Sequence, residues 1–514
     1  MKKIFSLLLA LSLLLSGFAA LAEGAYPVTE EPITVKALGT DSDPAAFAKR
    51  EMKTWKLLAE ITNVNFEFTA IDPEQLPVFL AAGNWPDVFC VPLTAAQLND
   101  YGILGTRFVN YLDYLDYMPN LKKTMEEYPM VKHVLVKSNG AMYELPRVDN
   151  VATACTARLH FRQDVLDQYG LSMPETVDEF YSVLKTIYEK TGKSPLGDMS
   201  DYEMQMLFPS FGPYVHFDFD DDGQGKLVHT RTSEQYRRFL SFIHKLYAEN
   251  LLHQEYLTMD GATRSALVKN GDICFGTSYF SNLTADCFAD GQIHLGTLAP
   301  LKSQWNDAPR VYNGEAFPQP IGWAINAKSE HIVEICKALD VAYATAEVVP
   351  GTGLYSAAFW YGPENVTWAW MDDAHTEYDY INIPSDMAPL EYARKVYISW
   401  TVGRNDVWGN AVSASLNNSH YRQLGYIANV KPYTAETLVP FKLLNFTEDE
   451  QTVLDDYYVN ITTYISEMQS KFVAGVENID DDAAWEAYCK TVADMHMAEV
   501  LEVYQASYDR WLGK

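Results

Sequence analysis

Several aromatic side chains stand beside carboxylates in turn-rich stretches of this sequence. The segment "LAAGNWPDVF" places Trp85 and Asp87 around a proline, and "FWYGPENVTW" sets Glu364 among aromatic residues. Flat rings stack on the C–H faces of a hydroxylated ligand, and charged groups bind its hydroxyls through short hydrogen bonds. The candidate ligand-binding residues are Trp85, Asp87, Arg162, Tyr279, Trp323, Trp360, Tyr361, Glu364 and Trp368. These residue types are typical of a site that binds a hydroxylated ligand.

Structural alternatives exist for the first of these candidates. Trp85 could instead pack against its own domain at this corner, because tryptophan is often partly buried whatever its function. Asp87 could accept a ligand hydroxyl or cap the following segment. Arg162 suits either hydroxyl binding or a pair between two lobes, and Asp164 beside it is expected to be a helix N-cap.

The later candidates divide in the same way. Trp323 alternates with Ile321 and Ile325, which favours a strand residue buried in a core over a ligand contact. Trp360 and Tyr361 lie in an irregular Gly/Pro segment, where binding residues are common. The expectation of a ligand contact is therefore stronger for this pair than for Trp323.

A possible metal loop occurs in "DFDDDGQGKLV", where Asp218, Asp220 and Asp222 have the opening spacing of a calcium loop. The twelfth position, which needs a bidentate glutamate, is His229. The Asp-Gly turn between two short extended runs predicts a β-hairpin instead. We therefore expect no bound metal.

Other chemistry is sparse. The stretch "GTGLYS" lacks the third glycine of a dinucleotide loop, and no P-loop or zinc-protease motif occurs, so no cofactor is expected. Cys274 and Cys287 could pair in an exported protein, but scattered cysteines are more often small buried residues. The six cysteines are Cys90, Cys155, Cys274, Cys287, Cys336 and Cys489.

The N-terminus has the form of an export signal. Lys2 and Lys3 precede an apolar run, and small residues before Ala22 predict cleavage after that residue. We therefore expect an extracytoplasmic protein, secreted or associated with the cell surface. The first cysteine is Cys90, so the sequence predicts no lipid-anchored cysteine at the cleavage point.

The mature chain is strongly acidic. Loss of Lys2 and Lys3 reduces the 39 basic residues to 37 against 68 acidic ones, a net charge of −31. Such a surface repels phosphate backbones and anionic lipids, which argues against nucleic-acid and membrane partners. We expect a monomer, and 514 residues suffice for two domains or lobes.

The pattern of elements is mixed. "ITVKALGT", a helical segment ending near Asn63 and then "FEF" predict strand, helix and strand, the start of an α/β unit. Similar units recur near Gly271 and from Ile321 onward. The last hundred residues predict amphipathic helices, with N-terminal caps at Thr447 and at the acids 480–482.

Several stretches together resemble the extracellular solute-binding proteins of ABC importers, in particular the large oligosaccharide-type members. The most specific match is "HFRQDVLDQYGLSMPETVDEFYSVL". In "FWYGPENVTW", Asn365 and Trp368 replace the usual glycine and aromatic residue. The other matching stretches are "LAAGNWPDVF", "NGAMYELP", "NGDICFGTSYF", "WAINAKSEHIVEICKALD" and "VYQASYDRW". Their order from about Ile33 to Trp511 covers nearly the whole mature chain.

The resemblance implies an α/β, two-lobed periplasmic-binding-protein-like fold with hinge crossings and a helical C-terminal part. It implies a protein without enzymatic activity that captures a carbohydrate between its lobes and delivers it to membrane permease subunits. The implied division is a signal peptide at 1–22, lobe 1 at 23–150, lobe 2 at 151–315, a return to lobe 1 at 316–395, and a mainly lobe-2 helical part at 396–514.

Other functions remain open at this point. A peptide or another small solute could be the cargo, and a sensor would present its ligand to a membrane receptor instead of a permease. A secreted polysaccharide-degrading enzyme also needs an aromatic cleft, and the 68 acidic residues could include a catalytic pair of carboxylates.

Overall fold

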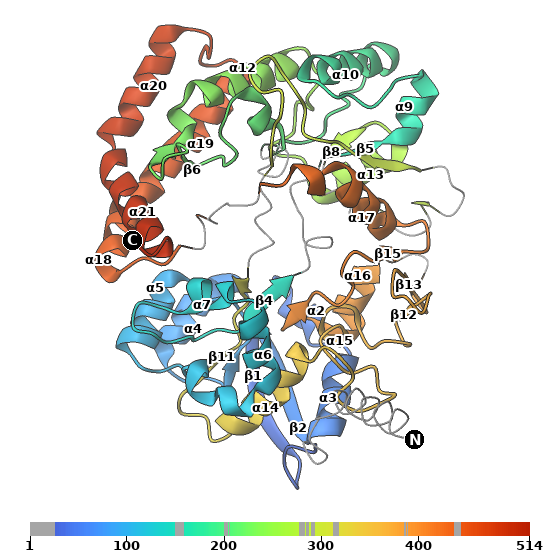
Figure 1. Cartoon of the computed structure of the whole chain (residues 1–514), viewed down its shortest axis with the longest axis vertical. Coiled ribbons are helices and arrows are strands. Elements are labelled where there is room, and N and C mark those ends of the chain that lie inside the picture. Colours follow the sequence, from blue (N-terminus) through green and yellow to red (C-terminus); the bar gives the residue numbers. More distant parts are fainter. Residues whose placement is uncertain are drawn as a thin grey trace, which may run out of the picture.

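The chain folds into two bodies of mixed helix and sheet, lobe 1 below and lobe 2 above in Figure 1. The computed structural model describes residues 26–149, 159–199, 204, 206–276, 283, 287–288, 293–311, 318–384, 387, 389–435, 441 and 444–514. Tyr279 and Cys155 lie outside these residues. No helix in the described part combines the length and the apolar character needed to cross a bilayer.

Lobe 1 is built around a four-stranded sheet of order β11-β3-β1-β2. Strands β1 (Ile33–Thr40) and β2 (Val64–Ile71) pair in parallel, with α3 (Lys53–Thr62) between them in the chain. Trp55 and Leu58 lie one turn apart on α3 and are buried. Asn63, at φ 59°, ends the helix in the left-handed conformation that asparagine tolerates. The predicted strand, helix and strand are confirmed.

Lobe 1 is formed by two separate parts of the chain. The first part contributes α2 (Pro44–Phe47), α4 (Leu76–Ala82), β3 (Val88–Phe89), α5 (Ala95–Gln97), α6 (Pro119–Glu127), α7 (Met130–Leu135) and β4 (Pro146–Asp149). The second part contributes β10 (Gln319–Pro320), β11 (Ala324–Ile325), α14 (Ile332–Asp340), α15 (Ala358–Tyr361), β12 (Trp368–Trp370), β13 (Glu377–Tyr380), α16 (Pro389–Tyr392), β14 (Arg404–Asn405) and β15 (Val412–Ser413).

Lobe 2 is mainly helical around a small antiparallel sheet of order β8-β5-β9. Helix α10 begins with a capping box, in which Thr176 and Glu179 satisfy each other's backbone amides, and ends at Gly192. The elements of its first part are β5 (His160–Arg162), α9 (Gln163–Tyr169), α10 (Val177–Thr191), β6 (Phe219–Asp221), β7 (Leu227–His229), α12 (Glu234–Ala248), α13 (Gly261–Asn270), β8 (Phe275–Gly276) and β9 (Leu295–Thr297).

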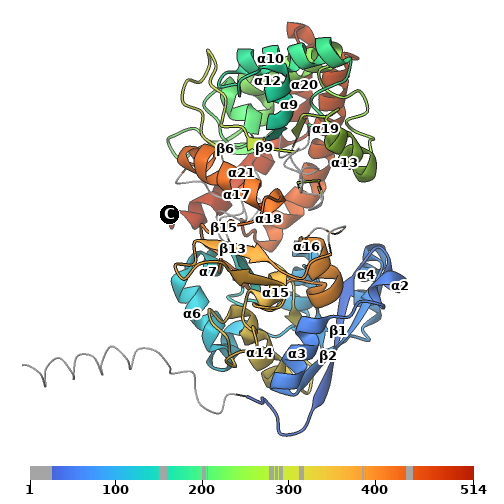
Figure 2. The ribbon, with the colours of Figure 1, turned by 90° about the vertical axis from the view of Figure 1, so that its right-hand side faces the viewer.

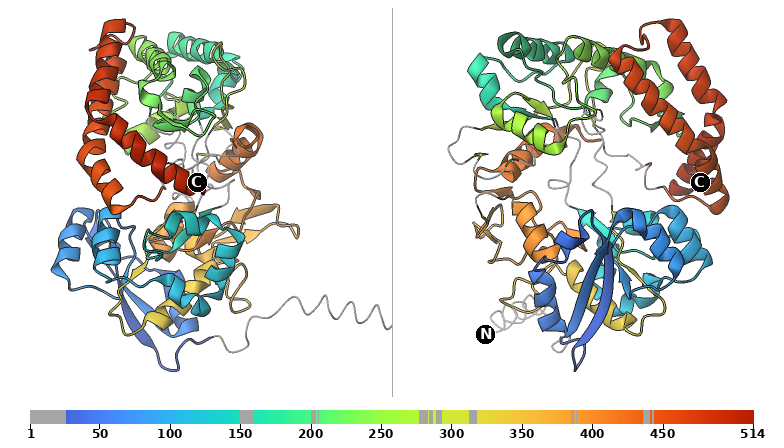
Figure 3. Two further views of the ribbon diagram at one scale, coloured as in Figure 1. Left: turned by 60° about the vertical axis from the view of Figure 1, so that its left-hand side comes forward. Right: turned by 180° about the vertical axis from the view of Figure 1, so that it is seen from behind.

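The C-terminal helices belong to lobe 2 but also reach lobe 1. They are α17 (Asn418–Asn429), α18 (Glu448–Val453), α19 (Val459–Ala474), α20 (Asp482–Asp494) and α21 (Met497–Trp511), and the last four run along one side of lobe 2 (Figure 3, red). The predicted caps are confirmed, since Thr447 forms a capping box and Asp481 caps α20. The Asn445 side chain donates to carbonyls of His133 and Val136 at the end of α7.

A three-stranded sheet of order β10-β4-β14 lies where the lobes meet (Figure 1). Strand β4 is the last described element before the chain enters lobe 2, and β10 is the first after it returns. We call these three strands the hinge sheet. Side chains on the hinge sheet therefore lie beside the junction of the two lobes.

Two large hydrophobic cores match the two lobes. The lobe-1 core extends from Val35 to Val148 and resumes at Trp323, ending at Ala411. The lobe-2 core extends from Leu159 to Val311 and resumes at Tyr426. The sequence division placed 396–514 mainly in lobe 2, whereas 402–411 pack in the lobe-1 core.

Candidate functional site

The hinge strand β4 carries two charged side chains on one face. Arg147 and Asp149 are two residues apart, so their side chains project to the same side of the strand, where they form an ion pair. The Asp149 carboxylate also accepts a hydrogen bond of 2.6 Å from the Asn405 amide on β14. Asp149 is buried, whereas the Arg147 side chain keeps 26% of its surface exposed. This arginine is the accessible charged group of the cluster.

Aromatic rings surround this ion pair. The Arg147 guanidinium lies 5.1 Å from the centre of the Trp360 ring, a cation–π arrangement. Trp408 is sandwiched between Tyr361 and Tyr378, with both pairs of ring centres 3.7 Å apart. The indole N–H groups of Trp360 and Trp408 are buried and find no acceptor among the described residues. We call Arg147, Asp149, Trp360, Tyr361, Asn405 and Trp408 the hinge cluster.

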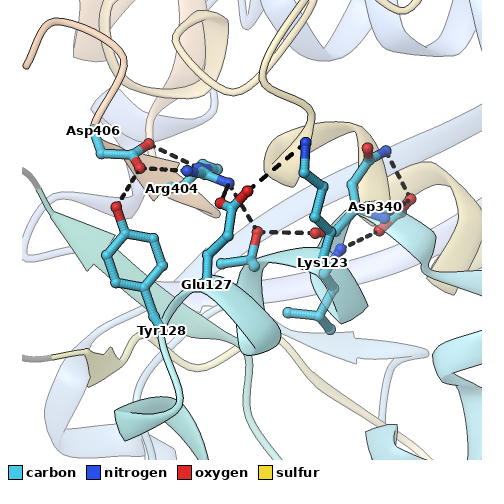
Figure 4. A network of polar contacts seen from close by, with 9 residues as sticks. Lys123, Glu127, Tyr128, Asp340, Arg404 and Asp406 are labelled. Carbon is cyan, nitrogen blue, oxygen red and sulfur yellow. Dashed lines mark hydrogen bonds and ion pairs between the residues drawn. The ribbon is translucent and has the colours of Figure 1, made fainter. Parts of the chain in front are cut away.

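A network of ion pairs fixes the third hinge strand to lobe 1 (Figure 4). Arg404 on β14 donates to both oxygens of Asp406, at 2.8 and 2.5 Å, and to Glu127 on α6 at 2.8 Å. The Tyr128 hydroxyl donates to the same Asp406 carboxylate at 2.7 Å. Because Arg404 is only 6% exposed, these partners compensate for its lost hydration. The network thus holds the strand that positions Asn405 and Trp408.

The other end of α6 is fixed by a buried carboxylate (Figure 4). Asp340, at the end of α14, accepts backbone N–H bonds from Asn120 at 3.1 Å and Leu121 at 2.8 Å, and one from the Asn120 amide. These amides belong to the first turn of α6, which has no intrahelical acceptor for them. Burial nonetheless raises the pKa of Asp340 to about 6.

Both lobes line a pocket of about 200 Å³ beside the hinge sheet. Lobe 1 contributes Lys137, Glu144 and Pro320, and lobe 2 contributes residues 444–448 and Gln451. Glu144 is only 3% exposed and accepts the backbone N–H of Leu93 at 2.8 Å. Burial raises the pKa of Glu144 to about 7 and lowers that of Lys137. The pocket therefore contains a carboxyl group that titrates near neutrality.

We expect Glu144→Gln to stabilise the protein at pH 8 and to have little effect at pH 5. Because the pKa of Glu144 is raised in the folded state, its neutral form is favoured there. The stability that the protonated Glu144 contributes to the folded state is fully present below the ordinary pKa near 4.5. It is lost as the pH rises through about 7. Glutamine keeps the acceptor for Leu93 without the charge, so the free energy of unfolding should rise by about 1–3 kcal/mol at pH 8. Thermal melting at both pH values measures it.

Glu126→Gln is the matched control for this prediction, since Glu126 is exposed on α6. Surface substitutions of this kind change stability by less than about 0.5 kcal/mol. Equal effects of Glu144→Gln at pH 5 and pH 8 would contradict the prediction.

The structure places Trp85 in a corner of lobe 1 apart from the hinge cluster. Its indole stacks on Phe108 with ring centres 4.8 Å apart, and the Arg107 guanidinium lies 3.6 Å from the ring centre. Its N–H donates to the carbonyl of Leu80 at 2.9 Å. Asp87 nearby uses both carboxylate oxygens. The Trp85 indole and the Asp87 carboxylate already have partners within lobe 1. A ligand role for either residue stays a prediction.

The partners of Asp87 explain its place in the fold. One oxygen accepts the backbone N–H of Lys36 on β1 at 2.8 Å, and the other accepts the hydroxyl of Ser329 at 2.6 Å. The carboxylate therefore joins the first strand of the sheet to the loop that follows β11. It does not cap the segment after it.

Arg162 is committed to contacts within lobe 2. Its guanidinium donates to both oxygens of Asp164, at 2.9 and 2.6 Å, and also to the carbonyls of Val268 and Lys269. The expectation that Asp164 is an N-cap is wrong, since α9 begins at Gln163 and Arg162 occupies the cap position. The Asp164 carboxylate is instead held by Arg162 and by the His294 backbone N–H.

Two predicted tryptophans are entirely buried in the lobe-1 core. Trp323 stacks on Trp55, with ring centres 4.9 Å apart, and donates to the carbonyl of Thr401. It has φ 63° and precedes β11, so the predicted strand alternation through this residue does not hold. Trp368 begins β12 and donates to the carbonyl of Gly362 at 3.1 Å. Their ligand contacts remain predictions.

The segment around Glu364 contributes directly to the hinge cluster. Trp360 and Tyr361 form the last residues of the short helix α15, which Gly362 ends at φ 83°. Glu364 accepts the Tyr355 hydroxyl at 2.7 Å and is half-buried. Of the nine predicted ligand-binding residues, Trp360 and Tyr361 are those that the structure brings together with Arg147 and Asp149.

The acidic stretch near Asp220 is a β-hairpin, as predicted, with β6 and β7 paired antiparallel. Each predicted metal ligand has a partner within the protein. Asp218 accepts from Arg231 at 2.5 Å, Asp220 from the backbone of Val215 and His216, and Asp222 from the backbone of Gln224 and Lys226. Among the described residues, no group of three acidic, histidine or cysteine side chains has the arrangement of a metal site.

Among the described residues, Cys90, Cys274, Cys336 and Cys489 are free thiols. Cys90, Cys274, Cys287 and Cys336 are buried, in agreement with the prediction that most of the six are small core residues, and Cys489 is half-buried. Cys274 and Cys287 are not joined in the structure.

The sequence prediction missed Arg147, Asp149, Asn405 and Trp408. The signal for the first two was the alternation of "PRVD" directly after the Tyr-Glu-Leu-Pro stretch, which puts two opposite charges on one face of a strand. Nothing local marks Asn405 or Trp408. Their place in the cluster depends on the pairing of β14 with β4, which joins residues about 250 positions apart.

The comparison with known families places this chain in a class of proteins. Residues 40–349 match the family described as bacterial extracellular solute-binding protein. The match spans more than half of the chain, and the chain therefore belongs to this family. Its members are binding proteins and not enzymes, and the family is extracellular.

Individual relatives are more distant. Lipoprotein LipO of Bacillus subtilis is 32% identical over 139 residues, covering 24% of this chain and 26% of that protein. The fructooligosaccharide ABC transporter substrate-binding protein FusA of Streptococcus pneumoniae is 22% identical over 427 residues, 77% of this chain and 74% of that protein. The chain thus spans about a quarter of the first relative and three quarters of the second.

Solved structures confirm the predicted two-lobed α/β fold. The structure of FusA from Streptococcus pneumoniae in complex with kestose has a TM-score of 0.72 at 18% identity, covering 94% of this chain and 100% of that one. The alginate-binding protein AlgQ2 without calcium ion has a TM-score of 0.66 at 20% identity, covering 94% and 99%. At these identities the likeness establishes the fold alone.

Proposed function

We propose that this chain is the substrate-binding protein of an ABC importer, which captures an oligosaccharide between its two lobes and delivers it to membrane permease subunits. Family membership supports the binding role, and relatives described as binding fructooligosaccharide or melibiose, raffinose and stachyose support the cargo class. The description of FusA as part of an ABC transporter supports the importing partner.

The observation that carries this proposal is the hinge cluster. An oligosaccharide presents C–H faces and hydroxyl edges, and the cluster combines aromatic rings, which are buried in this structure, with a partly exposed guanidinium and buried polar groups. Arg147 binds ligand hydroxyls, and Asp149 holds Arg147 in place. The indole N–H groups of Trp360 and Trp408 are further donors beside it. Closure of the lobes excludes water and strengthens each of these hydrogen bonds.

The site of action is outside the cytoplasm. The proposed mature chain begins after Ala22. Its strongly negative surface suits neutral cargo, because an acidic protein repels acidic saccharides at long range.

Isothermal titration of the mature chain with kestose, raffinose, maltotriose and trigalacturonate tests the cargo class. We expect one of the neutral glycans to bind with a Kd on the order of 1 μM, about −8 kcal/mol, without release of reducing ends. Binding of a tripeptide mixture with no response to any glycan would replace the carbohydrate proposal by a peptide receptor. Glycan hydrolysis would indicate an enzyme instead.

A further inference from the structure

A large groove in the described part of the molecule lies on lobe 2, far from the hinge sheet. It has a volume of about 850 Å³ and is lined by the first turns of α10, one face of α12 and the loop at 302–305. Helices α10 and α12 lie at the end of lobe 2 opposite to lobe 1 (Figures 1 and 2). A ligand in this groove would not touch the hinge cluster. The volume is within the range of small-molecule sites.

An exposed indole forms one wall of this groove. Of the tryptophans in the described residues, only Trp305 is exposed, at 41%. Its ring is backed by Phe211, with ring centres 5.6 Å apart and planes inclined by 29°, and the Arg238 guanidinium lies 5.8 Å from its centre. The indole thus presents a supported flat surface to the groove.

The loop that carries Trp305 is held rigidly. The Trp305 backbone N–H donates to the Ser303 hydroxyl at 3.0 Å, and the Ser303 N–H donates to the carbonyl of Asn306 at 2.8 Å. The Asn306 amide donates to the carbonyls of Pro209 and Gly212, at 2.8 and 3.0 Å. A platform fixed in advance loses little conformational entropy when a ligand stacks on it.

The polar lining of the groove has both signs of charge. Its cations include Arg237, Arg238 and Lys302, and its acids include Asp178 and Glu234. A polyanion such as nucleic acid requires cations without nearby acids, and an apolar peptide requires an apolar lining. Interspersed charged donors and acceptors around a flat ring instead match the hydroxyl edges and C–H face of a sugar.

We propose that this groove is a second saccharide-binding site, with Trp305 as the stacking platform and Arg238 and Lys302 as hydroxyl ligands. The inference goes beyond the proposed transport function, because it requires no closure of the lobes and no contact with the hinge cluster. It gives the protein a surface that holds a long glycan chain while the hinge site takes a shorter one.

Native gels cast with inulin or galactan test this site with the full mature chain, and polygalacturonate serves as the polyanion that the mixed charges of the groove should exclude. We expect one neutral polysaccharide to retard the wild-type protein, and Trp305→Ala to weaken that binding at least tenfold. Trp305→Phe keeps a flat ring and should bind with intermediate strength. Tyr117→Ala is the matched control, because Tyr117 is an exposed aromatic residue beside Lys337 on lobe 1 and should leave the retardation unchanged.

The outcomes separate this site from the hinge site. Retardation that survives Arg147→Gln but not Trp305→Ala supports the proposal, even if no glycan binds between the lobes. Retardation that is lost with Arg147→Gln and unchanged in Trp305→Ala overturns it, as does the absence of retardation by both neutral polysaccharides. Melting temperatures of each variant establish that the Trp305 variants are folded.

Discussion

Replacing Arg404 by methionine should lower the free energy of unfolding by about 3–5 kcal/mol, the usual cost of removing one partner from a buried ion pair. Arg404 is 6% exposed and bridges Asp406 and Glu127. Methionine fills part of the volume but leaves the largely buried Asp406 carboxylate with the Tyr128 hydroxyl as its remaining side-chain donor in the network of Figure 4. Urea denaturation followed by tryptophan fluorescence measures the loss.

The position of Arg404 gives this prediction a functional consequence. Arg404 is on β14, so its network fixes the neighbours Asn405 and Trp408 relative to α6. Loosening of this strand should weaken glycan binding together with stability, although Arg404 itself is not proposed as a ligand contact.

Lys395→Met provides the comparison for Arg404→Met. Lys395 and Glu391 form an exposed ion pair, with side chains 55% and 46% accessible. Exposed pairs of this kind contribute about 0–1 kcal/mol. If the two variants lost equal stability, the buried network would not anchor the hinge sheet as the geometry indicates.

The sequence was sufficient for the elements whose signals are local. The α/β unit at 33–71, the capping box at Thr447 and the hairpin at 219–229 each follow from periodicity or from one or two turn residues. Arg162 and Asp164 show the limit of local reasoning. The pattern suits an N-cap, but the nearby arginine binds the carboxylate more strongly than a backbone amide can.

The candidate site was harder to predict, because aromatic residues serve cores and ligands alike. Trp323, Trp360 and Trp368 are all buried and nothing in the residue type separates them, but of these three only Trp323 and Trp368 have their N–H groups bonded. The hinge cluster depends on pairing between β4 and β14, and no local signal encodes that contact. The alternation in "PRVD" indicates the charged pair Arg147 and Asp149, but nothing local in the sequence indicates the partners of this pair.

Replacing Arg147 by glutamine should weaken oligosaccharide binding by about 10- to 100-fold, since a hydrogen bond to a charged group contributes about 1.5–3 kcal/mol. Arg147 is the accessible charged residue of the hinge cluster, held by Asp149 and facing Trp360. Glutamine is shorter and neutral, so it cannot reproduce the charge-assisted bonds. Calorimetry with the glycan that binds the wild type best gives the change in Kd.

Arg107→Gln tests the competing location for the ligand. Arg107 covers the ring of Trp85 and donates to the carbonyl of Gly83, an arrangement that resembles Arg147 over Trp360 but lies in the other corner of lobe 1. Because Phe108 and Arg107 already pack on the Trp85 indole, we expect unchanged affinity in this variant. Loss of binding in Arg107→Gln with normal binding in Arg147→Gln would move the ligand from the hinge cluster to the Trp85 corner. A flat ring beside an arginine is thus not sufficient to define the site, and what distinguishes Arg147 is its position on β4, the last described strand before the chain enters lobe 2.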